Sequence, residues 1–143
     1  MTKQVYYQDV AVGGELPSLM KQPTTCQLVM WAGASGDLNP IHYDKDYAIE
    51  RGLPGVIVHG QLAGCFLGQL ITDWAGDEGN LKKLTLSYKG MNFPGETLVC
   101  KGRVTRKYVE DDRHFVVCNI WVENPRGERT VTGTATVTLP ARD

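Results

Sequence analysis

The spacing of hydrophobic residues predicts helices in the first half of the chain and strands in the second half. From Leu84 to Tyr88, apolar and polar residues alternate, which is typical of a strand with one buried face. The same alternation predicts strands over residues 98–108, 115–123 and 131–139, separated by turn-forming residues. Because short turns join antiparallel neighbours, this part of the chain is predicted to form an antiparallel meander.

Two short helices are predicted before these strands. The first follows a capping residue, Thr24 or Thr25, and ends near Gly36. The second is capped by Asp44, occupies residues 45–51 and ends at Gly52, a common stop signal. Closer to the N-terminus, Tyr6 to Val12 is predicted as a further strand.

The longest predicted helix begins at His59-Gly60 and continues to about Trp74. It has almost no polar face, so we expect it to be enclosed on most sides. Its apolar residues are Leu62, Ala63, Cys65, Phe66, Leu67, Leu70, Ile71 and Trp74. One enclosed helix followed by an antiparallel sheet predicts an α+β fold in which the sheet wraps around the helix, the hot-dog arrangement. We expect a single domain over residues 1–143, a common domain size.

Composition narrows the range of partners. The formal net charge of -1 and the pI near 6.3 provide no electrostatic attraction for nucleic acid or an anionic membrane surface. The N-terminal residues lack the apolar core of a secretion signal, and no stretch is long and apolar enough to span a membrane. We therefore expect a soluble, cytoplasmic protein. The cysteines lack close pairs and are predicted to be buried and reduced: Cys26, Cys65, Cys100 and Cys118.

The segment from Ser35 to His42 carries the candidate chemistry. Asp37 and His42 are separated by a bend at Asn39-Pro40, because proline disfavours helical geometry in the preceding residue. A carboxylate and an imidazole directed at one point can hold a water molecule and transfer protons to and from a substrate. The same residues are also common in ordinary turns, so a purely structural loop is an alternative.

Gly60 is the candidate for stabilising negative charge. Backbone N–H groups at the start of a helix can bind an oxyanion, such as the enolate formed when water adds to an enoyl thioester. A residue without a side chain lets a thioester approach closely, and an apolar groove beside the helix is expected to hold the acyl chain. His59 has a structural alternative, in which its side chain only orients the backbone by hydrogen bonding.

Other kinds of site are not indicated. His42, His59 and His114 lack the spacing of metal ligands, so no metal site is expected. A glycine-rich phosphate loop and a nucleophile elbow are both absent from the sequence. The basic residues of the predicted strands are interpreted as a solvated face.

The segment from Trp31 to Ala48, with Val58-His59-Gly60 beyond it, resembles the MaoC-like, (R)-specific enoyl-CoA hydratase family, which includes bacterial 3-hydroxyacyl-ACP dehydratase subunits. The residues that match the family signature are Ser35, Gly36, Asp37, Asn39, Pro40, Ile41, His42 and Ala48. The resemblance implies a hot-dog fold, Asp37 and His42 as the catalytic pair, and the Gly60 amide as the oxyanion donor. It further implies an acyl group on coenzyme A or acyl carrier protein, an (R)-3-hydroxyacyl product and no cofactor.

Two positions depart from the family pattern. Trp31 stands where the signature usually begins with tyrosine or phenylalanine, a change expected to affect only packing. Some relatives carry a serine partway along the central helix, where this chain has Gly64, Cys65 and Gly68. The two glycines are expected either to allow close contact with the sheet or to leave room for acyl carbons.

The predicted function is therefore reversible hydration of enoyl thioesters, or dehydration of 3-hydroxyacyl thioesters, in fatty acid metabolism. Catalysis is assigned to Asp37, His42 and Gly60, and substrate contacts are expected from Ser35, Asn39, His59 and Gly60. An acyl thioesterase is the alternative activity, because the same fold can direct water at the thioester carbonyl. An open sheet edge would favour a homodimer or higher homo-oligomer, and a catalytic subunit that needs a related partner chain is the alternative.

Overall fold

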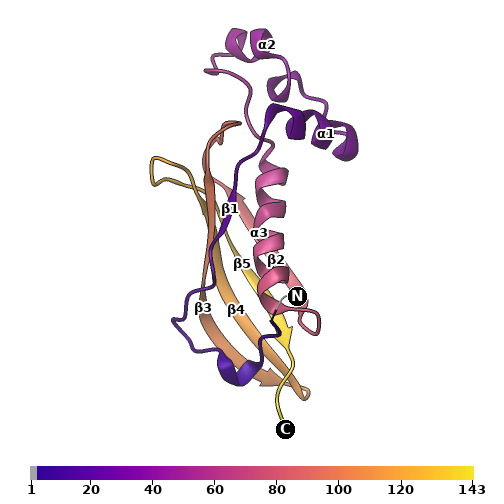
Figure 1. The fold of residues 1–143 in the computed structure, drawn as a ribbon, viewed down its shortest axis with the longest axis vertical. Helices are drawn as coiled ribbons and strands as arrows, with labels where there is room; N and C mark the ends of the chain where they lie inside the picture. The colour runs from indigo at the N-terminus through magenta and orange to yellow at the C-terminus, as the bar shows by residue number, and fades with distance from the viewer. Residues whose placement is uncertain (1–2) are drawn as a thin grey trace.

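A long helix, α3 (Gly60–Ala75), lies along one face of a five-stranded sheet and contacts strands from one edge of the sheet to the other (Figure 1). The computed structural model describes residues 3–143. Figure 1 shows two shorter helices, α1 and α2, beyond one end of the sheet, whereas the two termini lie toward its opposite end. The sheet packs along α3 as predicted, but the helix is not enclosed on its other side, where Cys65, Gln69 and Asp73 are exposed.

The sheet is entirely antiparallel, with the strand order β1-β3-β4-β5-β2. Its strands are β1 (Leu19–Lys21), β2 (Asn80–Tyr88), β3 (Leu98–Glu110), β4 (Arg113–Glu123) and β5 (Arg129–Leu139). β3, β4 and β5 form the predicted meander. The prediction was wrong about the strand before them, because β2 pairs with β5 across the sheet and not with β3.

Two hydrogen bonds explain the position of β2. The backbone N–H groups of Lys89 and Gly90 both donate to the carbonyl of Thr130, at 2.8 and 3.1 Å. The end of β2 is thereby held against the start of β5, and residues 89–97 cross to β3 as a loop longer than a tight hairpin. The other side of β2 has no neighbouring strand among the described residues.

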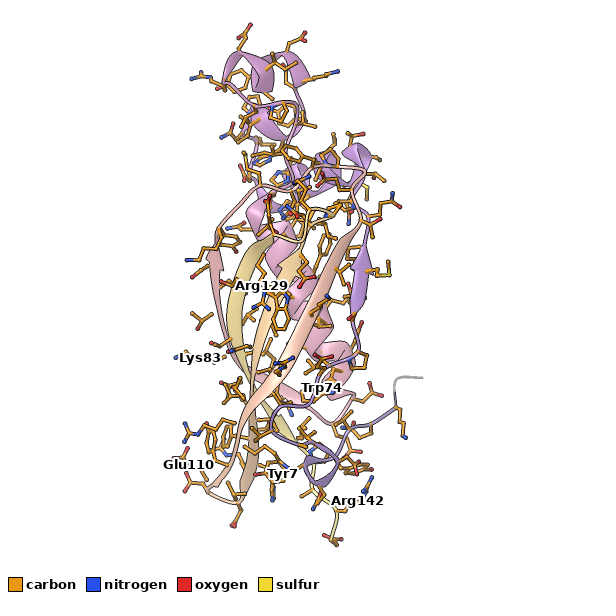
Figure 2. The ribbon with its side chains drawn as sticks, turned by 90° about the vertical axis from the view of Figure 1, so that its left-hand side faces the viewer. Tyr7, Trp74, Lys83, Glu110, Arg129 and Arg142 are labelled. Atoms are coloured by element: carbon orange, nitrogen blue, oxygen red, sulfur yellow. The ribbon has the colours of Figure 1, made fainter. Side chains whose placement is uncertain are left out.

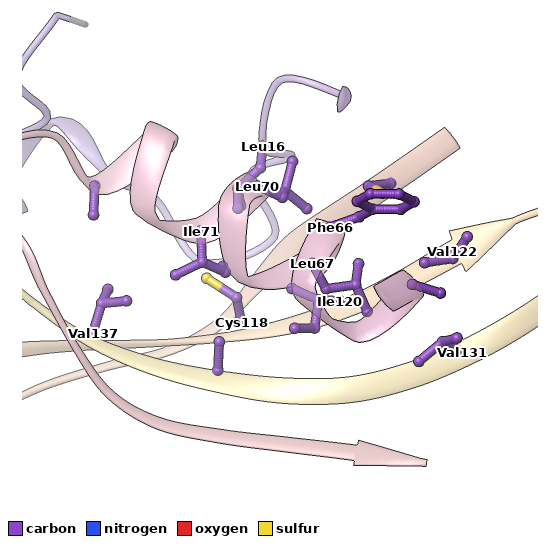
Figure 3. Close-up of a cluster of buried hydrophobic side chains, with 14 of the residues drawn as sticks. Leu16, Phe66, Leu67, Leu70, Ile71, Cys118, Ile120, Val122, Val131 and Val137 are labelled. Carbon is purple, nitrogen blue, oxygen red and sulfur yellow. The ribbon is translucent and has the colours of Figure 1, made fainter. Parts of the chain in front are cut away.

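The hydrophobic core lies between α3 and the sheet. Leu67 and Ile71 of α3 are fully buried and face Cys118, Ile120 and Val137 of the strands (Figure 3). Burying one such side chain contributes about 1.5–3 kcal/mol, so the apolar face of α3 is a principal source of stability. The core therefore fixes the orientation of α3, and with it the position of Gly60 at its first residue.

The two short helices begin at the predicted caps. The Thr24 side chain accepts a hydrogen bond from the N–H of Gln27 at the start of α1 (Thr25–Ser35). Asp44 does the same for the N–H of Tyr47 at the start of α2 (Lys45–Glu50). Side-chain caps satisfy N–H groups that have no partner within the helix.

The N-terminal segment differs from the prediction. Tyr6 to Val12 is not a strand; it contains a short 3-10 helix at Tyr7–Asp9. The N–H of Tyr7 donates to the carbonyl of Pro140, and the Lys107 ammonium donates to the carbonyl of Tyr7. These contacts replace a strand ladder, and they lie at the end of the molecule that carries Arg142 and Glu110 (Figure 2). The three-residue strand β1 was not predicted.

The cysteines divide into two classes. Cys100 and Cys118 are buried in the sheet, as expected, but Cys26 and Cys65 are exposed, contrary to the prediction. Burial raises the pKa of the Cys100 and Cys118 thiols to about 12. Among residues 3–143, none of the helices has both the length and the apolar character needed to cross a membrane.

Candidate active site

The loop after α1 is shaped by short-range hydrogen bonds. Gly36 ends α1 with a φ of 78°, a left-handed conformation that glycine adopts without strain. The Ser35 hydroxyl accepts a hydrogen bond from the N–H of Asp37 at 3.2 Å. The Asn39 side chain accepts one from the N–H of Ile41, also at 3.2 Å. The side-chain oxygens of Ser35 and Asn39 are therefore engaged in building the loop.

Asp37 and His42 face each other across this loop. Asp37 Oδ2 lies 3.6 Å from His42 Nε2, too far for a direct hydrogen bond but close enough for both atoms to contact one water molecule or one substrate group. The Asp37 side chain is 42% exposed and that of His42 only 7%. The pair thus combines a group that solvent reaches with a ring held inside the protein.

The protonation of His42 follows from its backbone partner. His42 Nδ1 lies 2.7 Å from the carbonyl oxygen of Ile57, and a carbonyl can only accept a hydrogen bond. Nδ1 therefore carries the proton, and in the neutral ring the lone pair lies on Nε2, the atom that faces Asp37. The N–H of Ile57 also donates to the carbonyl of Ile41, which joins the loop to the segment before α3.

His59 lies beneath this pair and is completely buried. Its ring stacks on that of His42, with the centroids 3.7 Å apart and the planes inclined by 20°. His59 Nε2 lies 3.3 Å from the carbonyl oxygen of Asp37. Burial, and then the proximity of His42, lower the pKa of His59 below its ordinary value of 6.5.

Gly60 begins α3 directly after His59 and is exposed. Its N–H belongs to the first turn, where the helix has no earlier carbonyl to accept a hydrogen bond. A Cβ atom at Gly60 would lie 3.1 Å from the Tyr88 ring, and one at Gly64 would lie 3.0 Å from the Tyr88 hydroxyl. Glycine at both positions lets the Tyr88 ring lie across the first two turns of α3.

A groove of about 470 Å³ lies between α3 and β2. It is mainly apolar, and Gly68 opens onto it, since a Cβ atom there would meet nothing within 4 Å. Its lining comprises Trp31, Gln61, Gly64, Cys65, Gly68, Leu84, Leu86 and Tyr88. Of the two glycines considered from the sequence, Gly64 thus provides close contact with the sheet and Gly68 provides space.

The three residues Asp37, His42 and His59 could be considered as metal ligands, because their donor atoms lie within 4.8 Å of one another. The stacked rings are a poor fit for one ion, however. Imidazole lone pairs lie in the ring planes, and two nearly parallel rings direct them side by side instead of toward a common point. The ring atoms Nδ1 of His42 and Nε2 of His59 also face backbone carbonyls.

Two contributors to the site were not predicted. The Ile57 carbonyl is a backbone group, so the identity of its side chain gives no signal of its role. Tyr88 was recognised only as the end of an alternating strand, and its contact with Gly60 depends on the pairing of β2 with β5. A sequence pattern contains no information on that pairing unless the order of the strands is known.

Comparison with known proteins places the chain in a family. A family model described as a MaoC like domain matches residues 12–124. The chain belongs to this MaoC-like family. A search of curated proteins finds 29% identity over 142 residues to the (R)-specific enoyl-CoA hydratase of Rhodospirillum rubrum, covering 96% of this chain and 93% of that protein.

Solved structures of MaoC-like proteins share the fold. The R-hydratase PhaJ1 from Pseudomonas aeruginosa superposes with a TM-score of 0.88 and 26% identity, covering 97% of this chain and 88% of that one. A chain of the ChsH1-ChsH2 complex from Mycobacterium tuberculosis gives a TM-score of 0.78 and 26% identity, covering 90% of this chain and 98% of that one. The predicted α+β hot-dog fold is therefore confirmed.

Some relatives of this MaoC-like chain are much longer. The fatty acid synthase beta subunit TOXC of Cochliobolus carbonum is 36% identical over 73 residues, a match that covers 50% of this chain and 4% of that protein. This MaoC-like chain thus spans a small fraction of such a relative.

Proposed function

We propose that this MaoC-like chain is a hydro-lyase that hydrates enoyl thioesters reversibly to (R)-3-hydroxyacyl thioesters. The observation that carries the proposal is the approach of Asp37 Oδ2 to His42 Nε2, 3.6 Å apart. Both residues contact His59, which directly precedes α3. The (R)-specific enoyl-CoA hydratase activity named for the Rhodospirillum rubrum relative supports the same reaction. Coenzyme A and acyl carrier protein are both suitable carriers, because the groups described act on the acyl part.

In the hydration direction, Asp37 and His42 hold one water molecule and divide two proton transfers between them. The water oxygen forms a bond to the β-carbon and its proton passes to one member of the pair. The other member carries a proton when the reaction begins and gives it to the α-carbon. The proton taken from the water then passes through solvent to that member, and the pair is restored. Positioned acid-base groups contribute about a hundred- to ten-thousand-fold to such a rate.

Gly60 supplies the third component of the proposed site. As the water oxygen attacks, negative charge develops on the thioester oxygen. The N–H of Gly60, reinforced by the positive end of the α3 dipole, donates a hydrogen bond to that oxygen. Ile57, His59 and Gly60 belong to one short segment, so the contacts that hold the pair also set its distance from the amide.

The groove beside α3 is the proposed acyl site. It adjoins Tyr88, whose ring also packs against Gly60, so an acyl chain bound there would continue from a thioester held at the amide. A Cβ atom at Gly68 would meet nothing within 4 Å, so Gly68→Leu is expected to extend a side chain into this space. We expect that variant to lose kcat/KM for long enoyl-CoA substrates more than for crotonyl-CoA. An equal loss for both would place the acyl chain elsewhere.

We propose a homodimer formed through β2. This edge strand has nine residues, and its free side would let a second copy continue the sheet. Leu84 and Tyr88, two apolar residues of this strand, are 36% and 52% exposed. Light scattering after size-exclusion chromatography should report a dimer, and Leu84→Lys should shift it to a monomer. A monomeric parent protein would favour the alternative of a related partner chain.

One assay tests the proposed reaction. The purified protein is incubated with crotonyl-CoA while enoyl absorbance and free thiol are followed in parallel. Hydration consumes the enoyl absorbance without releasing thiol, and the product should be (R)-3-hydroxybutyryl-CoA by chiral chromatography. Thiol release would instead indicate a thioesterase. If neither the enoyl absorbance nor the free thiol changes, with longer enoyl-CoA substrates included, the proposal is contradicted for the chain acting without a partner.

A further inference from the structure

His59 contacts both members of the Asp37–His42 pair while being shielded from solvent. Its ring stacks on His42 at 3.7 Å, and its Nε2 atom lies 3.3 Å from the Asp37 carbonyl oxygen. No other imidazole among residues 3–143 stacks on His42. The arrangement joins two residues of the loop to the N-terminus of α3, since His59 immediately precedes that helix.

The hydrogen bonding of His59 defines its protonation. A carbonyl only accepts, so Nε2 carries the proton that is donated to Asp37. Nδ1 is buried and has no hydrogen-bond partner among residues 3–143. A proton on Nδ1 would be a buried donor without an acceptor, and the charge would be costly in this position. The stable form of His59 is therefore the neutral ring with its proton on Nε2.

Proton transfer by His59 itself does not fit this geometry. One ring nitrogen donates a hydrogen bond to the backbone carbonyl of Asp37, and the other is buried without a hydrogen-bond partner in the described part of the chain. The ring is 0% exposed and covered on one face by His42, so it does not present an edge to a substrate. This geometry favours the alternative considered from the sequence, in which His59 orients the backbone, over a direct contact with the substrate.

We infer that His59 is a positioning residue, a neutral platform that fixes the plane of the His42 ring and the backbone of Asp37 for the proposed hydration. The inference rests on the proposed function. The stacked ring restricts rotation of His42, and the Nε2–H bond restricts the loop at Asp37. Displacing a catalytic group by about 1 Å can cost about a hundred-fold in rate, so such support has a measurable effect.

Two variants separate the two contacts. His59→Phe keeps an aromatic ring beneath His42 but removes the donor to Asp37. His59→Gln keeps an N–H donor but removes the ring. Each is expected to lower kcat about ten- to a hundred-fold with little change in KM, the effect typical of losing a residue that orients a catalytic group. His114→Gln, which alters a histidine that packs on Tyr7 instead, is the matched control and should keep the parent kcat.

The pH profile distinguishes positioning from proton transfer. In both variants the curve of kcat against pH should keep the shape of the parent curve at a lower height. Loss of one limb would show that His59 transfers a proton, and the inference would be wrong. Parent values of kcat in both folded variants would also overturn it, while leaving the proposed hydratase function intact.

Two measurements do not depend on activity. Imidazole nitrogen NMR of the parent protein should show His59 as the neutral ring protonated on Nε2; a proton on Nδ1 near neutral pH would overturn the inference. Amide hydrogen exchange of residues 37–42 should accelerate in His59→Phe, and unchanged exchange would contradict the platform role. If these residues respond but the parent protein hydrates no enoyl thioester, the proposed function fails and the structural role of His59 stands.

Discussion

The carbonyl of Ile57 accepts a hydrogen bond from His42 Nδ1 at 2.7 Å, so the candidate catalytic loop is tied to the segment that enters α3. This contact determines which nitrogen of His42 faces Asp37. It also connects the site to the hydrophobic core, because α3 is held there by its buried face. The chemistry of the loop therefore depends on packing that is distant in the sequence.

Removing either member of the pair should abolish hydration without unfolding the protein. Asp37→Asn keeps the size of the side chain but removes the charge, and His42→Gln removes the acid-base ring. We expect each to lower kcat for crotonyl-CoA about a hundred- to ten-thousand-fold. The exposed Asp46 of α2 provides the matched control, and Asp46→Asn should keep the parent rate. Parent activity in Asp37→Asn would show that the proposed mechanism is wrong.

The two central glycines of α3 should respond oppositely to alanine. At Gly64 a Cβ atom would lie 2.8 Å from a Leu86 methyl group, and the other Leu86 methyl fills the space where a Cβ atom of Gly133 would lie, 2.9 Å from that position. Leu86 therefore cannot move away easily, and Gly64→Ala should lower the free energy of unfolding by about 1–3 kcal/mol.

At Gly68 the same substitution meets open space. Alanine is the better helix former, so Gly68→Ala should raise the free energy of unfolding by up to about 1 kcal/mol. Urea unfolding of the parent and both variants measures the difference. Equal stability of the two variants would mean that Leu86 does not pack against Gly64 as described.

The cysteines should differ in reactivity. The thiolate is the reactive form, and a pKa of about 12 keeps Cys100 and Cys118 as thiols near neutral pH. A chromogenic thiol reagent should label Cys26 and Cys65 in the folded protein and the buried pair only after unfolding. Because Cys65 lines the proposed acyl groove, a bound long-chain thioester should protect it and leave Cys26 reactive. Serine variants of the two exposed cysteines assign the signals.

Protonation of His59 should link stability to pH. Because its pKa is lower in the folded protein than the ordinary value of 6.5, the unfolded chain binds more protons as the pH falls below that value. The free energy of unfolding should therefore decrease below about pH 6.5, by at most about 1.4 kcal/mol per pH unit from this one group. His59→Phe should lack this component of the slope. Identical slopes in the two proteins would mean that His59 titrates alike in both states.

Much of the site could be predicted because its signals are local. Capping by Thr24 and Asp44 and the bend around Pro40 each depend on residues a few positions apart, and the structure confirms them. The strand predicted over Tyr6 to Val12 was wrong because Lys107 and Pro140, far along the chain, bind that backbone. The exposure of Cys65 could not be predicted either, because it depends on which side of α3 the sheet leaves open.

The sequence by itself determined the helices, three successive strands and the motif that contains Asp37 and His42. The spacing of hydrophobic residues and the chemistry of turns depend on residues that are close together in the sequence. Only the tertiary structure decided that β2 pairs with β5, that Tyr88 packs against Gly60, and that His59 stacks on His42. Those relationships arise when α3 and the strands pack to bury their apolar faces together. Contacts of this kind join residues that no short pattern relates.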